Sequence, residues 1–133
     1  MNRKNPNQPA PVETEILSAL WEIGPCPVKR IHERLNAGKE SPRVITTTLK
    51  LLQVMMGKGF VERDESTWPH TYRAVIAKET LQRSYVVDSL QRVFDGSVQN
   101  FLSCALDADA VSQEEIEAIR ALLKSYEEAK GND

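Results

Sequence analysis

The sequence is poor in cysteine and histidine and has no long hydrophobic run, and each shortage excludes a class of protein. Its 133 residues include two cysteines, Cys26 and Cys104, far apart and without a CxxC pair. Neither a zinc site nor a disulfide framework is expected, so we interpret both as packed or idle thiols. Charged residues interrupt every apolar stretch, which argues against a membrane span and predicts a cytoplasmic protein without membrane insertion.

The two histidines lack the neighbours that catalysis needs. His32 lies between Arg30 and Arg34, and His70 follows Pro69. Neither is close in the sequence to paired carboxylates or to a glycine-rich phosphate loop. We therefore predict that the protein is not an enzyme and that it carries no cofactor or metal.

A helix is predicted between Ser41 and Gly59. Ser41 suits the N-cap, Pro42 the first helical position, and the Gly57–Gly59 stretch a left-handed stop. Apolar residues recur every three to four positions and predict a stripe that faces a core, made of Ile45, Leu49, Leu52, Met55 and Met56. The opposite face has two cations, two hydroxyls and no carboxylate: Arg43, Thr46, Thr47 and Lys50. Taken alone, that face is equally typical of an ordinary solvated helix.

The elements around this helix favour a nucleic-acid reader. Apolar spacing predicts helices over residues 13–23 and 27–35, and residues 60–64 and 71–75 have strand character, joined by a polar tip that contains Trp68-Pro69. Two helices separated by a turn, the second with basic N-terminal residues, are typical of helix-turn-helix docking on DNA. The hairpin that follows would be a wing.

The chain after Ala77 is predicted to be helical and to dimerise. Helical spacing continues through residues 81–94, 97–106 and 112–126, with Ser97 as a cap and a capping box at Ser112–Glu115. These helices carry more apolar surface than they can bury within one subunit, so we predict a surface for a second copy. Its candidate residues are Leu81, Tyr85, Leu90, Val93, Phe94, Phe101, Leu102, Ile116, Ile119 and Leu123. The alternative is a monomer whose helices fold back on the first domain.

Together these patterns predict a mainly α fold with a small β-hairpin wing. We expect a flexible leader over residues 1–11, a winged helix-turn-helix DNA-binding domain over 12–77 and a helical dimerisation module over 78–133. The net charge of −2 divides accordingly, since residues 1–77 hold 11 basic against 8 acidic side chains and residues 78–133 hold 6 against 11. Only the first part is therefore expected to approach phosphate.

Short segments spread over the chain after Pro11 carry a further pattern. They are Glu15-Ile16-Leu17, Leu20-Trp21-Glu22, Gly24-Pro25, Ile31-His32-Glu33, Leu35-Asn36-Ala37, Thr46-Thr47-Thr48-Leu49, Leu52-Gln53, Gly57-Lys58-Gly59-Phe60-Val61, Tyr72-Arg73 and Phe94-Asp95-Gly96-Ser97. Their order and spacing resemble the BlaI/MecI family of penicillinase repressors. The resemblance implies an N-terminal winged helix, a helical C-terminal module that dimerises, and binding to a palindromic operator as a transcriptional repressor.

The resemblance also implies which residues contact DNA. In such repressors the third helix enters the major groove, which carries over to Arg43, Thr46, Thr47 and Lys50. Arg63 and Arg73 in the hairpin are further candidates, each equally consistent with a cross-strand surface charge. The family usually has a glycine and a basic residue at the tip, where this sequence has Thr67-Trp68, which argues against a wing contact with DNA.

Relief by proteolysis is a further expectation from the resemblance. Family members that respond to β-lactams are cleaved in the C-terminal module by a membrane-bound sensor protease. Such a protease is therefore a candidate partner. Asn100-Phe101 lies in that region, but the cleaved bond is expected a few residues later, where this chain has Cys104-Ala105. Copper-responsive members carry a cysteine cluster, and its absence here argues against copper sensing.

Two functions remain open on the sequence alone. The first is a homodimeric, sequence-specific DNA-binding repressor that acts on a palindromic operator. The second is a winged-helix protein-interaction module without DNA binding, which the negative net charge and a Trp68 anchor on the wing would favour.

Overall fold

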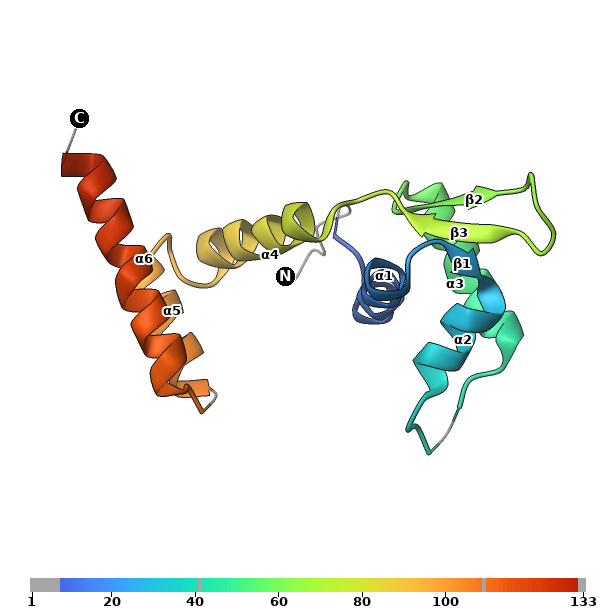
Figure 1. The fold of residues 1–133 in the computed structure, drawn as a ribbon, viewed down its shortest axis with the longest axis horizontal. Helices are drawn as coiled ribbons and strands as arrows, with labels where there is room; N and C mark the ends of the chain where they lie inside the picture. Colours follow the sequence, from blue (N-terminus) through green and yellow to red (C-terminus); the bar gives the residue numbers. More distant parts are fainter. Residues whose placement is uncertain (1–7, 41, 109, 132–133) are drawn as a thin grey trace. The chain divides into compact units, whose positions relative to one another are not determined.

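The computed structural model describes residues 8–40, 42–108 and 110–131, and it divides the chain into two compact units (Figure 1). The first unit ends at Val87 and the second begins at Asp88, within one helix, α4 (Lys78–Arg92). The predicted division at residues 77 and 78 stays a prediction. Each unit is described by itself.

The first unit has a mainly helical fold with a small antiparallel sheet. Its elements are α1 (Pro11–Ile23), β1 (Cys26–Pro27), α2 (Val28–Asn36), α3 (Ile45–Gly57), β2 (Val61–Asp64), β3 (Thr71–Ala74) and the first part of α4. The strand order is β1-β3-β2. Tyr72 in the central strand therefore pairs with Cys26 of β1 on one side and with Arg63 of β2 on the other. The predicted helices and hairpin are confirmed, and the two-residue strand β1 is an addition.

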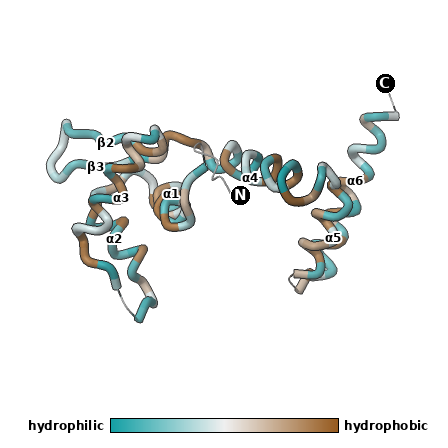
Figure 2. The backbone as a smooth tube through the Cα atoms, turned by 180° about the vertical axis from the view of Figure 1, so that it is seen from behind, coloured by the Kyte–Doolittle hydropathy of each residue, from teal (hydrophilic) through white to brown (hydrophobic). Residues whose placement is uncertain are grey.

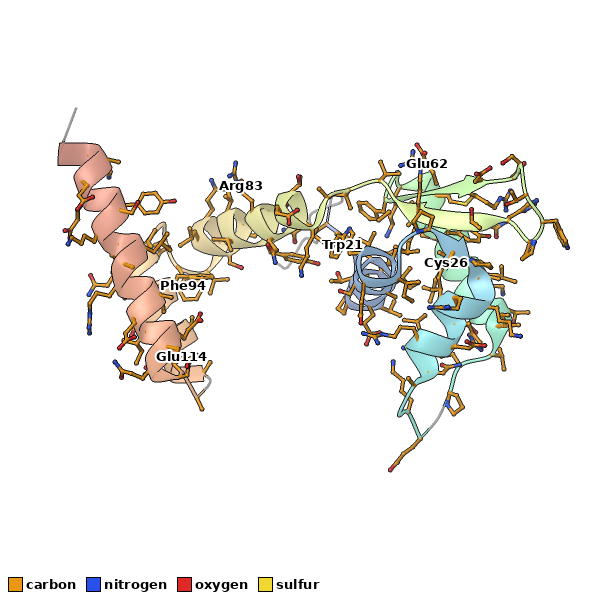
Figure 3. All side chains as sticks on the ribbon, in the orientation of Figure 1. Trp21, Cys26, Glu62, Arg83, Phe94 and Glu114 are labelled. Carbon is orange, nitrogen blue, oxygen red and sulfur yellow. The ribbon has the colours of Figure 1, made fainter. Side chains whose placement is uncertain are left out.

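The core of the first unit lies where α1, α2, α3 and the sheet meet. Its buried apolar residues come from every one of these elements, and from α4: Ile16, Leu17, Leu20, Cys26, Ile31, Leu35, Leu52, Met55, Phe60, Val61, Tyr72 and Leu81. Trp21 packs against this cluster, and its Nε1–H donates to the carbonyl of Ile76 at 2.9 Å (Figure 3). Trp21 therefore anchors α1 in this core.

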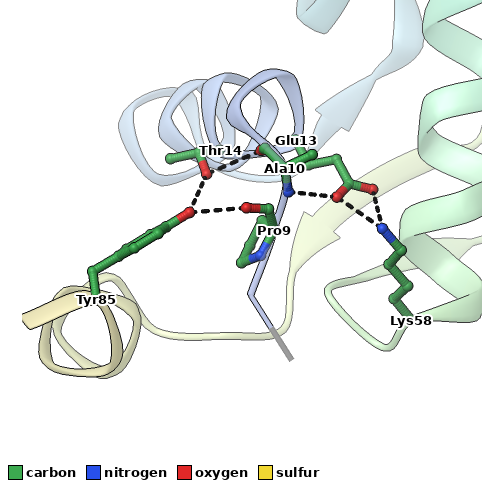
Figure 4. A network of polar contacts seen from close by, with 6 residues as sticks. All are labelled: Pro9, Ala10, Glu13, Thr14, Lys58 and Tyr85. Atoms are coloured by element: carbon green, nitrogen blue, oxygen red, sulfur yellow. Dashed lines mark hydrogen bonds and ion pairs between the residues drawn. The ribbon is translucent and has the colours of Figure 1, made fainter. Parts of the chain in front are cut away.

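Polar contacts fix the start of α1 against two other elements (Figure 4). The Glu13 carboxylate, only 2% exposed, accepts a hydrogen bond from the backbone N–H of Ala10 at 2.8 Å and is 3.0 Å from the Lys58 ammonium. On the other side of α1, the hydroxyl of Tyr85 lies 3.0 Å from that of Thr14 and donates to the carbonyl of Pro9. Residues 9 and 10, expected in a flexible leader, are therefore held, while residues 1–7 of that leader lie outside the described residues.

Helix α3 differs from its prediction at its N-terminus. The helix begins at Ile45, after an N-cap at Val44 with extended backbone, so Pro42 does not occupy the first helical position. Ser41, the predicted N-cap, lies outside the described residues. The predicted stop is confirmed, because the helix ends at Gly57 and Gly59 adopts a positive φ of 81°.

The buried stripe of α3 also differs from the prediction. Thr48, Leu52 and Met55 are fully buried, whereas Ile45 is 41% and Leu49 39% exposed. A polar residue can take a core position here because its hydroxyl finds a partner, the His32 imidazole, at 2.9 Å. The stripe is therefore rotated around the helix relative to one drawn through apolar residues alone.

The second unit contains the end of α4 and the helices α5 (Val98–Ala108) and α6 (Gln113–Gly131). The Ser97 cap and the serine half of the predicted capping box are present, because Ser97 accepts from the backbone N–H of Asn100 and Ser112 from that of Glu115, each at 3.1 Å. None of the described residues of α5 and α6 is buried, although apolar residues recur along both helices (Figure 2).

Candidate nucleic-acid interface

The candidate interface is the exposed face of α3. It consists of three adjacent pairs, each four residues further along the helix: Ile45 and Thr46, Leu49 and Lys50, and Gln53 and Val54. Because residues four apart lie on the same side of a helix, these pairs form one continuous strip. Helix α3 contains no aspartate or glutamate, so the strip presents a cation, a hydroxyl, an amide and apolar groups without a negative charge.

The four predicted contact residues differ in their exposure. Thr46 and Lys50 are exposed on the strip, whereas Thr47 is half-buried at its edge. Arg43 precedes the helix and is half-buried, with its Nη1 atom buried and without a hydrogen-bond partner among the described residues. An unpaired buried donor is costly, and this one belongs to a guanidinium at the start of the strip.

A polar network behind the strip ties α3 to α2. The Nδ1 atom of His32 lies 2.9 Å from the Thr48 hydroxyl, and its Nε2 lies 3.0 Å from the amide nitrogen of Asn36. The same Asn36 amide pairs with the backbone of Arg43, since its nitrogen donates to the Arg43 carbonyl at 2.9 Å and its oxygen accepts from the Arg43 N–H at 3.1 Å.

This network assigns the protonation of His32. The two bonds to the backbone of Arg43 fix which atom of the Asn36 amide is nitrogen, so the amide N–H faces His32 Nε2, which must accept. The remaining proton of the neutral ring is then on Nδ1, where it donates to Thr48. This network was not predicted from the sequence. The spacing of His32 and Asn36, four residues apart on one face of a helix, could have indicated that their side chains meet.

The wing has little free positive charge. Arg73 forms an ion pair with Glu62, and Arg63 forms one with Glu65. Hydrogen bonds that the Arg63 guanidinium donates to Tyr72 and Glu65 raise its pKa. With Asp64, the strands and their turn hold three carboxylates against these two cations, so the wing is a weaker candidate for phosphate binding than α3.

The tip of the wing is exposed and aromatic. Trp68 is 86% exposed and precedes Pro69 through a cis peptide bond. Its ring lies 4.9 Å from that of His70, centroid to centroid, in an edge-to-face arrangement at 83°. Hydrogen bonds from the Ser66 hydroxyl and backbone N–H lower the pKa of Asp64 and close the turn before the tip.

The ten predicted dimerisation residues fall into two groups. Leu81 is 2% exposed in the core of the first unit, and Tyr85 is hydrogen-bonded to Thr14 and Pro9, so both are occupied by packing within that unit. The other eight lie in the second unit, where Phe94 and Phe101 stack edge to face with centroids 5.2 Å apart. Of these eight, Val93 is 71% and Leu123 is 53% exposed.

A hollow within the second unit adds to this apolar surface. It has a volume of about 580 Å³ and is lined mainly by Leu102, Ala105, Leu106, Val111 and Ile119, from α5, α6 and their connection.

The two cysteines differ in exposure. Cys104 is exposed on α5, whereas Cys26 is buried in β1 (Figure 3), and burial raises the pKa of the Cys26 thiol.

Among the residues that the structure describes, no group of three or more histidine, cysteine, aspartate or glutamate side chains is arranged to hold a metal ion. No helix in the described ranges combines the length and apolar character needed to cross a bilayer.

Three helices followed by a β-hairpin, with the third helix open on one side, define the first unit as a winged-helix domain. The fold is similar to that of a MarR family protein from Bacillus stearothermophilus, with a TM-score of 0.50 over 92% of this chain and 76% of that chain, at 18% sequence identity. Residues 9–125 match the penicillinase repressor family, and the chain belongs to that family.

Curated relatives agree with this assignment. The chain is 28% identical to the transcriptional regulator BlaI of Mycobacterium tuberculosis over 91% of its own length and 86% of that protein. It is 22% identical to the methicillin resistance regulatory protein MecI of Staphylococcus aureus, over 84% of this chain and 89% of MecI. These relatives are transcriptional regulators and not enzymes, as the sequence predicted for this protein.

Proposed function

We propose that the protein is a homodimeric, sequence-specific DNA-binding transcriptional repressor that acts on a palindromic operator. The observation that carries this proposal is the exposed strip of α3, which presents Lys50 and Thr46 and has no carboxylate. Association with a duplex depends on cations that displace the counterions of phosphate, and an acidic strip would repel it. Membership of a repressor family supports the same function.

Each predicted residue has a role that its position supports. Lys50 contacts a phosphate or a guanine edge from the middle of the strip, and Thr46 offers a hydroxyl to phosphate or a methyl group to thymine. Arg43 swings its guanidinium towards the DNA backbone, which gives the unpaired Nη1 an acceptor. Thr47 lies at the edge of the strip, while Arg63 and Arg73 make at most peripheral contacts because glutamates already neutralise them.

Dimerisation uses the second unit. Eight predicted residues lie in this unit and none of them is buried within one copy: Leu90, Val93, Phe94, Phe101, Leu102, Ile116, Ile119 and Leu123. Covering them with a second copy removes apolar surface from water. Two recognition helices then reach half-sites about one helical turn, roughly 34 Å, apart on one side of the duplex.

The salt dependence of DNA binding tests this function. An operator fragment is first selected from random-sequence duplexes, and its affinity is measured by fluorescence anisotropy across a salt series. The double variant Arg43→Ala and Lys50→Ala should bind more weakly, with the slope of log K against log salt reduced by about 0.9 for each lost phosphate contact. The variant Arg120→Ala and Lys124→Ala removes the same charge from α6 and should leave the slope unchanged.

The outcomes separate the two candidate functions. An unchanged slope in the first double variant would remove the α3 strip from the interface. Failure to select or retain any duplex at low salt, together with capture of a protein partner through the wing, would favour the protein-interaction module. That second candidate has its own observation in the 86% exposure of Trp68.

We also propose that repression is relieved by cleavage in α5. Asn100, Phe101, Cys104 and Ala105 lie on this helix, and all but Phe101 are exposed. A protease binds an extended substrate, so α5 must unwind locally before a membrane-bound sensor protease cuts it. Mass spectrometry of the chain from induced cells should reveal a fragment that ends within residues 100–105, and an intact chain under induction would contradict the proposal.

A further inference from the structure

Two apolar side chains occupy the strip of α3 where the sequence predicted a buried stripe. Ile45 is 41% and Leu49 39% exposed, and they lie four residues apart, each followed by one of the polar residues of the strip. The packing of the first unit does not require them there, since a different stripe of α3 contacts the core. Exposed apolar residues at this spacing form a small, defined contact surface.

The neighbouring charge indicates what covers this surface. Lys50 adjoins Leu49, Arg43 precedes Ile45 by two residues, and α3 has no carboxylate, so the surface suits a polyanion. A protein partner would call for a larger apolar patch with aromatic anchors, and α3 contains no aromatic residue. The occupant is therefore a duplex that offers both phosphate and an apolar group.

In the major groove, that apolar group is the methyl group of thymine. The other bases present only donors and acceptors at their edges, so contact of an apolar side chain with this methyl distinguishes thymine. The N-terminal residues of a recognition helix are the ones that reach base edges, and Ile45 is the first residue of α3 while Leu49 begins its second turn.

We propose that Ile45 and Leu49 read thymine methyl groups and so determine the sequence preference of the protein, whereas Lys50 and Arg43 supply affinity. This inference rests on the proposed function, because it names how the same strip distinguishes sequences. It also accounts for the exposure of two side chains that the fold itself does not bury.

Deoxyuridine tests the inference, since it differs from thymidine only by the missing methyl group. Each thymine of the selected duplex is replaced in turn, and the affinity of the full-length chain is measured. We expect a loss of about fourfold at each contacted thymine, the value for one methyl group removed from an apolar contact. For Leu49→Ala and for Ile45→Ala, there should be one position per half-site at which replacing thymine by deoxyuridine no longer lowers the affinity for the duplex. Val54→Ala, at the C-terminal end of the strip, should keep the full sensitivity.

A second variant tests whether Leu49 determines the preferred base, because it should change that base from thymine to adenine. Leu49→Gln keeps the length of the side chain and ends in an amide, which pairs with adenine in the major groove. Repeated selection with this variant should replace the thymine preference at the Leu49 position with adenine.

The outcomes distinguish the inference from the proposed function. If no duplex is bound, the proposed function fails and the inference fails with it. If binding and its salt dependence persist but deoxyuridine is accepted everywhere without loss, the inference alone is overturned. Full deoxyuridine sensitivity in both alanine variants would likewise overturn it, as would an unchanged thymine preference in Leu49→Gln.

Discussion

At the scale of single residues, one buried hydroxyl decides how helix α3 is oriented. Thr48 is fully buried and lies 2.9 Å from His32, and Asn36 connects the same imidazole to the backbone of Arg43. Because buried polar groups are costly when unpaired, this network favours one orientation of α3 over those rotated around its axis. The buried hydrogen bond of Thr48 therefore determines which residues of α3 face outward.

Replacement of Thr48 by valine tests this role. The substitution preserves shape but removes the hydroxyl, leaving the Nδ1–H of His32 without its acceptor. We expect the free energy of unfolding to fall by about 1–3 kcal/mol, the cost of an unsatisfied buried group. Urea denaturation measures it, and Thr46→Val, the same change at an exposed position of the same helix, should stay within about 0.5 kcal/mol of the parent chain. Equal effects at the two positions would contradict the network.

At the scale of helices and strands, much of the fold could be predicted from the sequence. Apolar spacing located the helices, and the turn residues around Trp68 and Pro69 located the hairpin, because these signals are local. The start of α3 could not be placed, since Ser41 and Pro42 carry a stronger local helix-start signal than Val44, the residue that caps it. Strand β1 was missed because two residues have no periodicity, and only pairing with β3 defines them.

The candidate site was predictable in part for the same reason. Thr46 and Lys50 follow from a polar face that is visible in the sequence, and both are exposed. The exposure of Ile45 and Leu49 was not predictable, because an apolar residue on a helix is normally assigned to the core. Only the tertiary partner of Thr48 reveals that the buried stripe runs elsewhere.

The wing makes a prediction of its own. Its arginines are paired with Glu62 and Glu65, so their charge is already balanced and few counterions are released when they approach phosphate. Replacement of Arg63 and Arg73 together by alanine should therefore change the slope of log K against log salt by well under the value of about 0.9 for one phosphate contact. The salt series used for Lys50→Ala provides the comparison, and a reduction near two contacts would show that DNA displaces both glutamates.

At the scale of the whole molecule, the two units differ in the kind of surface that they expose. The first buries a continuous core and leaves a strip free of negative charge, while the second leaves apolar residues open along its helices. A helical unit with none of the described residues of α5 and α6 buried is poorly stabilised by itself. Its stability should consequently depend on a second copy.

A charge placed in this surface tests the dimer. Leu123→Glu introduces a carboxylate at an apolar residue that is 53% exposed, and burying it against a second copy would be costly. Sedimentation velocity should show a monomer where the parent chain is a dimer, with a matching loss of operator affinity. Ser125→Glu adds the same charge two residues further along α6, on the opposite side, and should remain dimeric. A parent chain that is monomeric at every concentration would contradict the model of a dimeric repressor.

The separation of inner and outer sides on α3 has a practical consequence for engineering. The side chains that hold this helix in place, Thr48 among them, are different from those that point outward, so the two sets can be altered independently. A combinatorial library that randomises Ile45, Thr46, Leu49 and Lys50 while preserving His32, Asn36 and Thr48 should yield folded regulators with reprogrammed target sites. The same scaffold thereby becomes a source of orthogonal genetic switches.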